Sequence, residues 1–347
     1  MRHTLLIAVV VVAGCRGKPA APVQPASLAD AMAARFAPSA DELFAHARQL
    51  ASLRGRGAGT ADERAAADYV AAEMAELGLA PGAPRYLQEL PLAGGGTSHN
   101  VIGILAGDDD AHHLVLGAHV DHLGIKDGAV YPGADDNASG VAVLLGVAAA
   151  WRRAGFRPRH TILFVGFGAE EVGLVGSTYY VEHPARPLDQ MAAMINLDML
   201  GRPRFYDYRA MKLAKGMAGI ADGPGLGLLA GGSTELMAIG RCAARASAIP
   251  SYAPEDFPSL RSLIDEQTRN RGDFAPFAAR GVPFLFFSTS EHDDYHQPTD
   301  TIDTIDPAMI RTAAIAVWRT TLALDLLPAR SADHPVACPI APLRAAR

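Results

Sequence analysis

The sequence predicts a three-layer α/β/α fold, in which helices cover both faces of a central, mostly parallel sheet. Short apolar stretches typical of buried strands alternate along the chain with longer segments of helical periodicity. Polar residues follow several of these strand-like stretches directly, as they do at the carboxyl edge of parallel sheets. The chain has 347 residues and is 49% apolar, so it can bury a large core.

The charge of the chain argues against one class of partner. Its net charge is −6 and its pI is about 6.0, and the sequence has no block rich in Lys or Arg. Binding to phosphate backbones depends on clustered positive charge. We therefore expect no nucleic-acid partner.

The chain begins with the pattern of an export signal. Its first 15 residues are MRHTLLIAVVVVAGC, with an early Arg, an apolar stretch and small residues before Cys15. The apolar stretch is far shorter than the roughly 20 residues that span a bilayer, so we expect a cleaved signal over residues 1–14. The ending V-A-G-C resembles bacterial lipoprotein signals, which implies an exported protein held by a lipid on Cys15 to a bacterial membrane, facing the periplasm or the cell exterior. An ordinary secretory signal with an incidental cysteine is the alternative.

The rest of the chain divides into three parts. Residues 15–35 are rich in Pro and Ala and are expected to form a tether. Residues 36–328 show no internal repeat or linker, so we expect one domain there, followed by a tail over residues 329–347. Cys242 and Cys338 could pair in an oxidising compartment, but their spacing does not establish a disulfide. The sequence has no Cys-based metal motif.

The expected elements follow from local patterns. Thr60 and Glu63 stand at capping-box spacing and open a segment of helical period that ends near Leu79. Buried strands are expected over residues 112–119, 161–167, 191–199 and 283–289. Further helices are expected over residues 138–151, 175–183, 233–246 and 306–324.

Acidic residues and histidines follow these strands. Those directly after a strand are His119, Asp121, Glu170, Glu171 and Asp198. Two loops, GADDNASG (133–140) and EHDDYHQPTD (291–300), add more. A single Glu-Glu pair is usually a solvated loop tip. Five segments that bring carboxylate or imidazole groups to the same sheet edge indicate a shared ligand instead.

Carboxylates and imidazoles without thiolates suit zinc or a similar divalent ion. Charge counting favours two ions. Three candidate carboxylates, Asp135, Glu171 and Asp198, carry −3, and two Zn²⁺ with one bridging hydroxide balance that charge; one Zn²⁺ alone leaves −1. Two ions about 3.5–4 Å apart that share a carboxylate and a hydroxide are a recurring hydrolytic arrangement.

Five motifs together carry a resemblance to a known family. The segments GAHVDHLG, GADDNASG, GFGAEEVGLVGS, NLDM and YHQPTD, in this order, resemble the co-catalytic zinc aminopeptidases of family M28 over roughly residues 40–325. The resemblance implies the phosphorylase/hydrolase-like form of the α/β/α fold, with a central mixed sheet. It also implies an exopeptidase that removes N-terminal residues from peptides, using a hydroxide bridged by two zinc ions and a Glu general base. We expect the protein to be a monomer.

The resemblance assigns the metal ligands residue by residue. The implied ligands are His119, Asp135, Glu171, Asp198 and His296. His119 and Asp198 would hold one zinc ion, Glu171 and His296 the other, and Asp135 would bridge both. A cis peptide bond between Asp135 and Asp136 is implied as well.

The resemblance also assigns the catalytic roles. Glu170 would be the general base, and Tyr295 would stabilise the oxyanion. Asp121 would accept the second N–H of the first histidine ligand and fix its tautomer. We expect His122 to have no metal role, and the Y-H-x-P-x-D pattern favours His296 over His292.

Three other functions remain open. An M28-like carboxypeptidase is the nearest, although no single Arg stands out as an anchor for a substrate carboxylate. A glutaminyl cyclase-type acyltransferase would keep one zinc ion, and a non-catalytic binding module would keep the fold but not the metals. The presence of all five implied ligands and Glu170 favours the aminopeptidase.

Overall fold

The computed structural model of the chain describes residues 25–206, 216, 222–259, 261–268 and 270–326. The expected signal, Cys15, Cys338 and the tail over residues 329–347 lie outside these residues. Cys242 is buried and disulfide-bonded. Across the described part, each helix is too short or too polar to cross a membrane.

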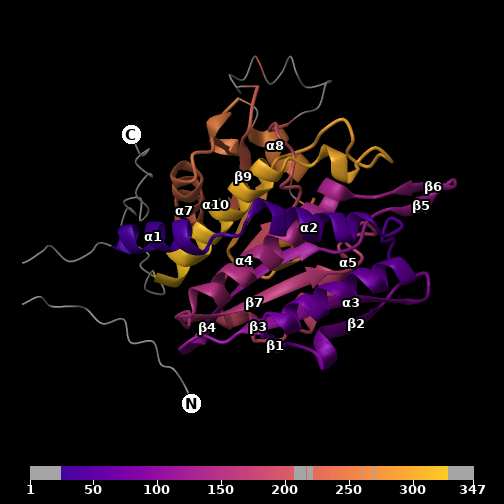
Figure 1. Cartoon of the computed structure of the whole chain (residues 1–347), viewed down its shortest axis with the longest axis horizontal. Coiled ribbons are helices and arrows are strands. Elements are labelled where there is room, and N and C mark those ends of the chain that lie inside the picture. The colour runs from indigo at the N-terminus through magenta and orange to yellow at the C-terminus, as the bar shows by residue number, and fades with distance from the viewer. Residues whose placement is uncertain (1–24, 207–215, 217–221, 260, 269, 327–347) are drawn as a thin grey trace, which may run out of the picture.

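A nine-stranded mixed sheet forms the middle layer of the fold (Figure 1). Its order is β1-β3-β7-β4-β8-β11-β9-β10, with β2 paired to β3. The four neighbouring central strands are parallel: β7 (His160–Phe167), β4 (Asp109–His119), β8 (Met191–Leu197) and β11 (Phe284–Ser288). These are the four strands that the sequence predicts. Their carboxyl ends therefore lie along one edge of the sheet.

The other strands lie outside this parallel centre. Antiparallel neighbours are β3 (Thr97–Leu105) beside β7 and β9 (Leu226–Gly231) beside β11. The remaining strands of the sheet are β1 (Ala80–Pro81), β2 (Leu87–Pro91) and β10 (Ser251–Tyr252). A separate hairpin, β5 (Gly124–Lys126) and β6 (Ala129–Tyr131), projects from the molecule (Figure 1).

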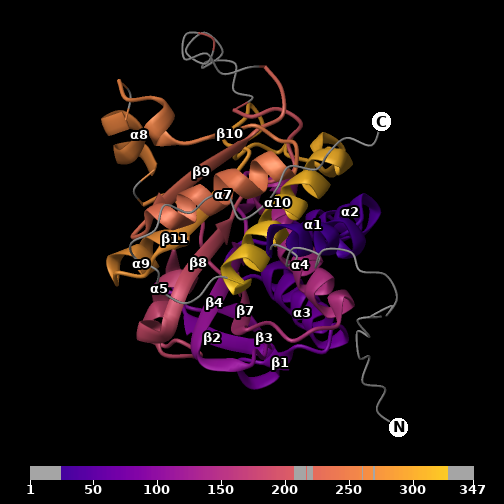
Figure 2. The ribbon, with the colours of Figure 1, turned by 90° about the vertical axis from the view of Figure 1, so that its left-hand side faces the viewer.

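Helices cover both faces of the sheet, as predicted. One face carries α2 (Ala40–Ala51), α3 (Ala61–Glu76), α4 (Gly140–Ala154), α7 (Thr234–Ala246) and α10 (Pro307–Leu326). The opposite face carries α5 (Val175–Glu182) and α9 (Phe274–Ala279), and Figure 2 shows this separation. The short helix α8 (Arg261–Thr268) lies away from the sheet. Five of these helices, α3, α4, α5, α7 and α10, match predicted segments.

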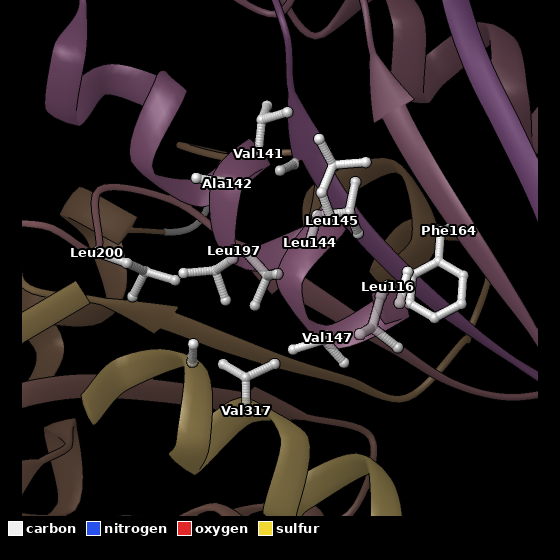
Figure 3. Close-up of a cluster of buried hydrophobic side chains, with 14 of the residues drawn as sticks. Leu116, Val141, Ala142, Leu144, Leu145, Val147, Phe164, Leu197, Leu200 and Val317 are labelled. Atoms are coloured by element: carbon white, nitrogen blue, oxygen red, sulfur yellow. The ribbon is translucent and has the colours of Figure 1, made fainter. Parts of the chain in front are cut away.

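The core follows from the alternation of side chains along each strand. Leu114 and Leu116 of β4 point to the α4 face, and Val115 points to the α5 face. Figure 3 shows Leu116 packed near α4 and Val317 of α10 facing the same cluster. Because β4 is buried on both faces, its sequence is a continuous apolar run, which is the reason it could be predicted.

The start of the described chain differs from the expected tether over residues 15–35. Residues Pro25–Phe36 form helix α1, which packs against α10 and α4. Ala33 is fully buried, and Met32 and Phe36 contact the core. The Ala-rich composition suits a helix as well as a tether, and the apolar side chains of its last turns give it a surface to bury.

Arg56 is a buried cation that joins three segments beneath the carboxyl edge of the sheet. It donates hydrogen bonds to the carbonyl oxygens of Leu50, Val120, Pro132 and Gly133 at 2.6–3.0 Å, and only 1% of its surface is exposed. Burial lowers its pKa to about 10, so it remains charged at neutral pH. It therefore fixes the segment after β4 relative to the loop that follows β6.

We expect Arg56→Met to lower the free energy of unfolding by about 3–5 kcal/mol, because the change removes four hydrogen bonds to carbonyl groups, of which those of Leu50 and Gly133 keep a backbone amide as donor. Urea denaturation followed by circular dichroism measures the loss. The control is Arg157→Met, at a 63% exposed side chain paired with Asp108 at 3.7 Å, which should change stability by no more than about 0.5 kcal/mol. Equal effects of the two substitutions would contradict the role given to Arg56.

Candidate metal centre

The carboxyl edge of the parallel strands carries the predicted polar cluster. His119 is the last residue of β4, Asp198 follows β8 directly, and Glu171 lies four residues beyond β7. Asp136 comes from the turn η2 (Ala134–Ser139) at the start of α4, and His296 from the loop after β11. The sheet thus brings together residues that are far apart in the sequence.

These side chains form two groups, each of which could bind a metal ion. In the first, His119 Nε2 lies 3.2 Å from Asp136 Oδ1 and 3.4 Å from Asp198 Oδ1. In the second, His296 Nε2 lies 3.2 Å from Asp136 Oδ2 and 3.1 Å from Glu171 Oε2. The two oxygens of Asp136 therefore face different groups, which is the geometry of a bridging carboxylate.

Asp136 takes the position that the sequence assigned to Asp135, so that prediction is wrong by one residue. Asp135 turns away: its Oδ1 accepts the amide of Gly201 at 2.7 Å, and its Oδ2 lies 3.2 Å from Nε2 of His292. Both aspartate amides donate to the carboxylate of Asp300 at 3.0–3.1 Å, which fixes the turn from behind. Adjacent side chains leave such a turn in different directions, and the motif alone does not say which one faces the site.

The predicted cis peptide bond is displaced in the same way. It lies between Asp136 and Asn137, and not between Asp135 and Asp136. The side chain of Asn137 donates to the carbonyl of Leu197 at 2.9 Å and accepts the amide of Met199 at 3.2 Å. These contacts hold the turn against the end of β8, on either side of Asp198.

Of the two histidines in the loop after β11, His296 lies beside Asp136 and Glu171. His292 is buried beside Asp135 and is not part of either group of potential ligands. His122, for which we expected no metal role, lies in the second group with Asp136 and Glu171. The signal for it was its spacing, one residue beyond Asp121 in the segment that leaves β4.

Asp121 contacts the site differently from what the resemblance implied. Nδ1 of His119 lies 3.2 Å from the backbone oxygen of Asp121, closer than the 3.7 Å to its carboxylate. The carboxylate instead accepts the amides of Glu170 at 2.9 Å and Glu171 at 3.2 Å. Asp121 therefore orients the histidine through its main chain and the glutamate pair through its side chain.

Glu170 lies beside the two groups without being part of either. Its pKa is raised well above the usual range, chiefly by burial. The imidazole of His119 opposes that shift, while the carboxylates of Asp273, Asp198 and Asp121 add to it. A carboxyl group with a raised pKa is suited to accept and return a proton near neutral pH.

Tyr295 lies against the second group. Its ring stacks on that of His296 with centroids 3.9 Å apart, and its hydroxyl oxygen accepts a hydrogen bond from Arg271 at 3.1 Å. Burial, together with the negative charge of Asp136, raises the pKa of the phenol. The hydroxyl therefore stays protonated and can donate to an oxygen in the site.

The buried donor atoms of the two groups are better compensated by a divalent cation than by their contacts with one another. Asp198 Oδ1, Glu171 Oε1 and His122 Nδ1 are buried, and their partners within 3.4 Å are side chains of the site itself: Glu171 Oε1 lies 2.7 Å from His122 Nδ1, and Asp198 Oδ1 lies 3.4 Å from His119 Nε2. Unpaired buried carboxylate oxygens are costly unless a cation compensates them. The set of imidazole nitrogens and carboxylate oxygens is the one that zinc takes in proteins without cysteine ligands.

Comparisons with known proteins show a similarity to peptidases. The model of "Peptidase family M28" matches residues 100–217 and 245–321. Leupeptin-inactivating enzyme 1 of Streptomyces exfoliatus is 33% identical over 190 residues, which cover 52% of this chain and 41% of that enzyme. The chain spans less than half the length of the curated relatives that it matches.

Solved structures share the fold at low sequence identity. A zinc aminopeptidase from Bacillus subtilis has a TM-score of 0.62 and 18% identity, with 84% of this chain and 96% of that one covered. A glutaminyl cyclase of Porphyromonas gingivalis has a TM-score of 0.58 and 20% identity, with 82% and 98% covered. These likenesses establish the α/β/α fold, and the family match extends over more than half of the sequence. The chain belongs to peptidase family M28.

Proposed function

We propose that the protein is a zinc-dependent aminopeptidase that removes N-terminal residues from peptides. The observation that carries this proposal is the position of Asp136, whose two carboxylate oxygens each lie 3.2 Å from a histidine of a different group. This arrangement suits two cations that share one carboxylate. The relatives named above support zinc as the metal and peptides as the substrate class.

The residues that would hold the zinc ions are His119, Asp136, Glu171, Asp198 and His296. When bound, zinc supplies Lewis-acid chemistry, by polarising a substrate carbonyl and lowering the pKa of a water molecule. The protein supplies the proton transfer and the orientation of the reacting groups.

Glu170 is the proposed general base. It takes a proton from the attacking water and returns it to the amine that leaves when the peptide bond breaks. Asp121 holds the main chain of Glu170 through a 2.9 Å hydrogen bond, which keeps the base separate from the neighbouring ligand. Tyr295 donates its hydroxyl proton to the oxygen on which negative charge develops.

The charges around the site favour an aminopeptidase over a carboxypeptidase. Arg202 is paired with Asp294 at 2.6 Å, and Arg271 with Glu291 at 2.9 Å. Each of these two arginines thus has a carboxylate of the loop over residues 291–300 as a partner, although Nε and Nη1 of Arg202 make no hydrogen bond. The surplus of carboxylates suits the positively charged amine at a peptide N-terminus.

The fold does not separate an aminopeptidase from a cyclase, because a glutaminyl cyclase shares it. The donor set does. A single-zinc site needs one group of ligands, whereas here Asp136 joins two groups. This observation favours hydrolysis with two ions.

The substrate class is tested with leucine arylamide, its N-acetylated form and peptides labelled at the C-terminus. We expect release of arylamine only from the free-amine substrate, and stepwise shortening of peptides from the N-terminus, both measured by chromatography and mass spectrometry. Loss of activity after chelation and its recovery with Zn²⁺ complete the test. Shortening from the C-terminus would refute the proposal.

The adjacent glutamates are separated by replacing each in turn. Glu170→Gln should keep its zinc and lose turnover by about 10²–10⁴-fold, because only the proton transfer is removed. Glu171→Gln should lower zinc content as well as turnover. Elemental analysis of the purified variants and arylamide kinetics give the two readouts, and equal zinc loss in both variants would show that the roles are assigned wrongly.

We also propose that the protein is exported and held to a membrane by a lipid on Cys15. The V-A-G-C sequence at residues 12–15 supports this. In a bacterial host, Cys15→Ser should remove labelling by radioactive palmitate and move the protein from the membrane fraction to the soluble fraction. Unchanged fractionation with no lipid label in the wild-type protein would favour an ordinary secretory signal.

A further inference from the structure

His122 is a third histidine at the metal centre, and its position is fixed by the backbone around it. Its side chain is fully buried, and its amide donates to the carbonyl of Arg56 at 3.1 Å. The imidazole ring packs directly on Gly133, where an added Cβ would come within 2.5 Å of the ring carbon Cγ. Gly133 has a φ of +58°, which favours glycine. The chain therefore leaves space for this ring at the start of the turn that carries Asp136.

The nitrogen Nδ1 of His122 points into the second group of ligands. It lies 2.7 Å from Glu171 Oε1 and 3.7 Å from Asp136 Oδ2. The contact with Glu171 is an ion pair, and neither of its two buried atoms has another hydrogen-bond partner. Together with a carboxylate oxygen of Asp136, these atoms form a group within 4.8 Å of one another, which is close enough to bind a common cation.

The two groups then differ in the number of donors they contain. In the second group, His122 and His296 both lie beside the carboxylates of Asp136 and Glu171, which makes four donor residues. Around His119, the described residues of the group are Asp136 and Asp198. Four protein donors complete the coordination of a tetrahedral zinc ion, whereas three leave a position open for water or substrate.

We propose that His122 is a direct ligand, through Nδ1, of the zinc ion held by Asp136, Glu171 and His296. This inference rests on the proposed function, because it assumes zinc at the site. It makes the two ions unequal: the ion on the His122 side is enclosed by four protein donors and binds more tightly, and the ion on the His119 side keeps an open position.

The test compares His122→Phe with a matched control. Phenylalanine keeps the volume of the ring and removes both nitrogens. The control is His113→Phe, which replaces a buried histidine in β4, six residues before His119 and therefore about 20 Å along the strand from the site. Circular dichroism verifies that each variant is folded. Metal-free protein is then titrated with Zn²⁺ by calorimetry in the presence of a competing chelator.

We expect the wild-type protein and His113→Phe to bind two zinc ions, one more tightly than the other. In His122→Phe the tighter binding should weaken by about 10- to 100-fold or more, while the weaker binding changes less. Unchanged zinc affinities in a folded His122→Phe variant would overturn the inference. Failure of the wild-type protein to bind two ions would instead overturn the proposed function.

Proton NMR of the cobalt(II)-loaded protein separates a ligand from a residue that only orients Glu171. The N–H protons of imidazoles bound to cobalt are strongly shifted and exchange with water. We expect three such signals in the wild-type protein, from His119, His122 and His296, and two in His122→Phe. Only two shifted signals in the fully loaded wild-type protein would show that His122 is not bound to the metal.

Discussion

Burial of carboxylates at one edge of the sheet is the constraint on which the rest of the site depends. Asp121, Asp136 and Asp300 are each at most 3% exposed, and the side chain of Glu171 is 7% exposed. Buried negative charge must be matched by hydrogen bonds or by cations. Asp121 and Asp300 receive backbone amides from the loops that they support. The side chains of the carboxylates that face the two ligand groups lack such pairs of backbone amide donors. Bound cations would therefore stabilise their negative charge.

Buried hydrogen bonds hold the segments that carry the ligand residues in position. Arg56 holds the segment after β4 from below, and Asp300 and Asn137 fix the turn that carries Asp136. Each of these contacts joins main chain to a buried side chain, so each loop is held to a neighbouring loop or to the end of a strand. A shared carboxylate can only face two ions at once if both sides of its turn are held in this manner.

The parallel centre of the fold could be predicted because its strands are buried on both faces and are therefore continuous apolar runs. Four of the five implied ligands lie at the ends of these strands or in the Y-H-x-P-x-D loop, where spacing in the sequence determines position in space. The exception is Asp135. Which of two neighbouring aspartates faces the site depends on the contacts of Asp300 and Gly201, which come from elsewhere in the chain. His122 was missed for the same reason, because its neighbours Glu171 and Gly133 meet it only in the folded protein.

The proposed two-zinc site depends most on Asp136, the residue that both zinc ions would share. Diffraction from crystals of the zinc-loaded protein, measured at the zinc absorption edge, tests this directly. We expect two anomalous peaks about 3.5–4 Å apart, each nearest to a different carboxylate oxygen of Asp136. A single peak, or two peaks joined through Asp135, would contradict the account.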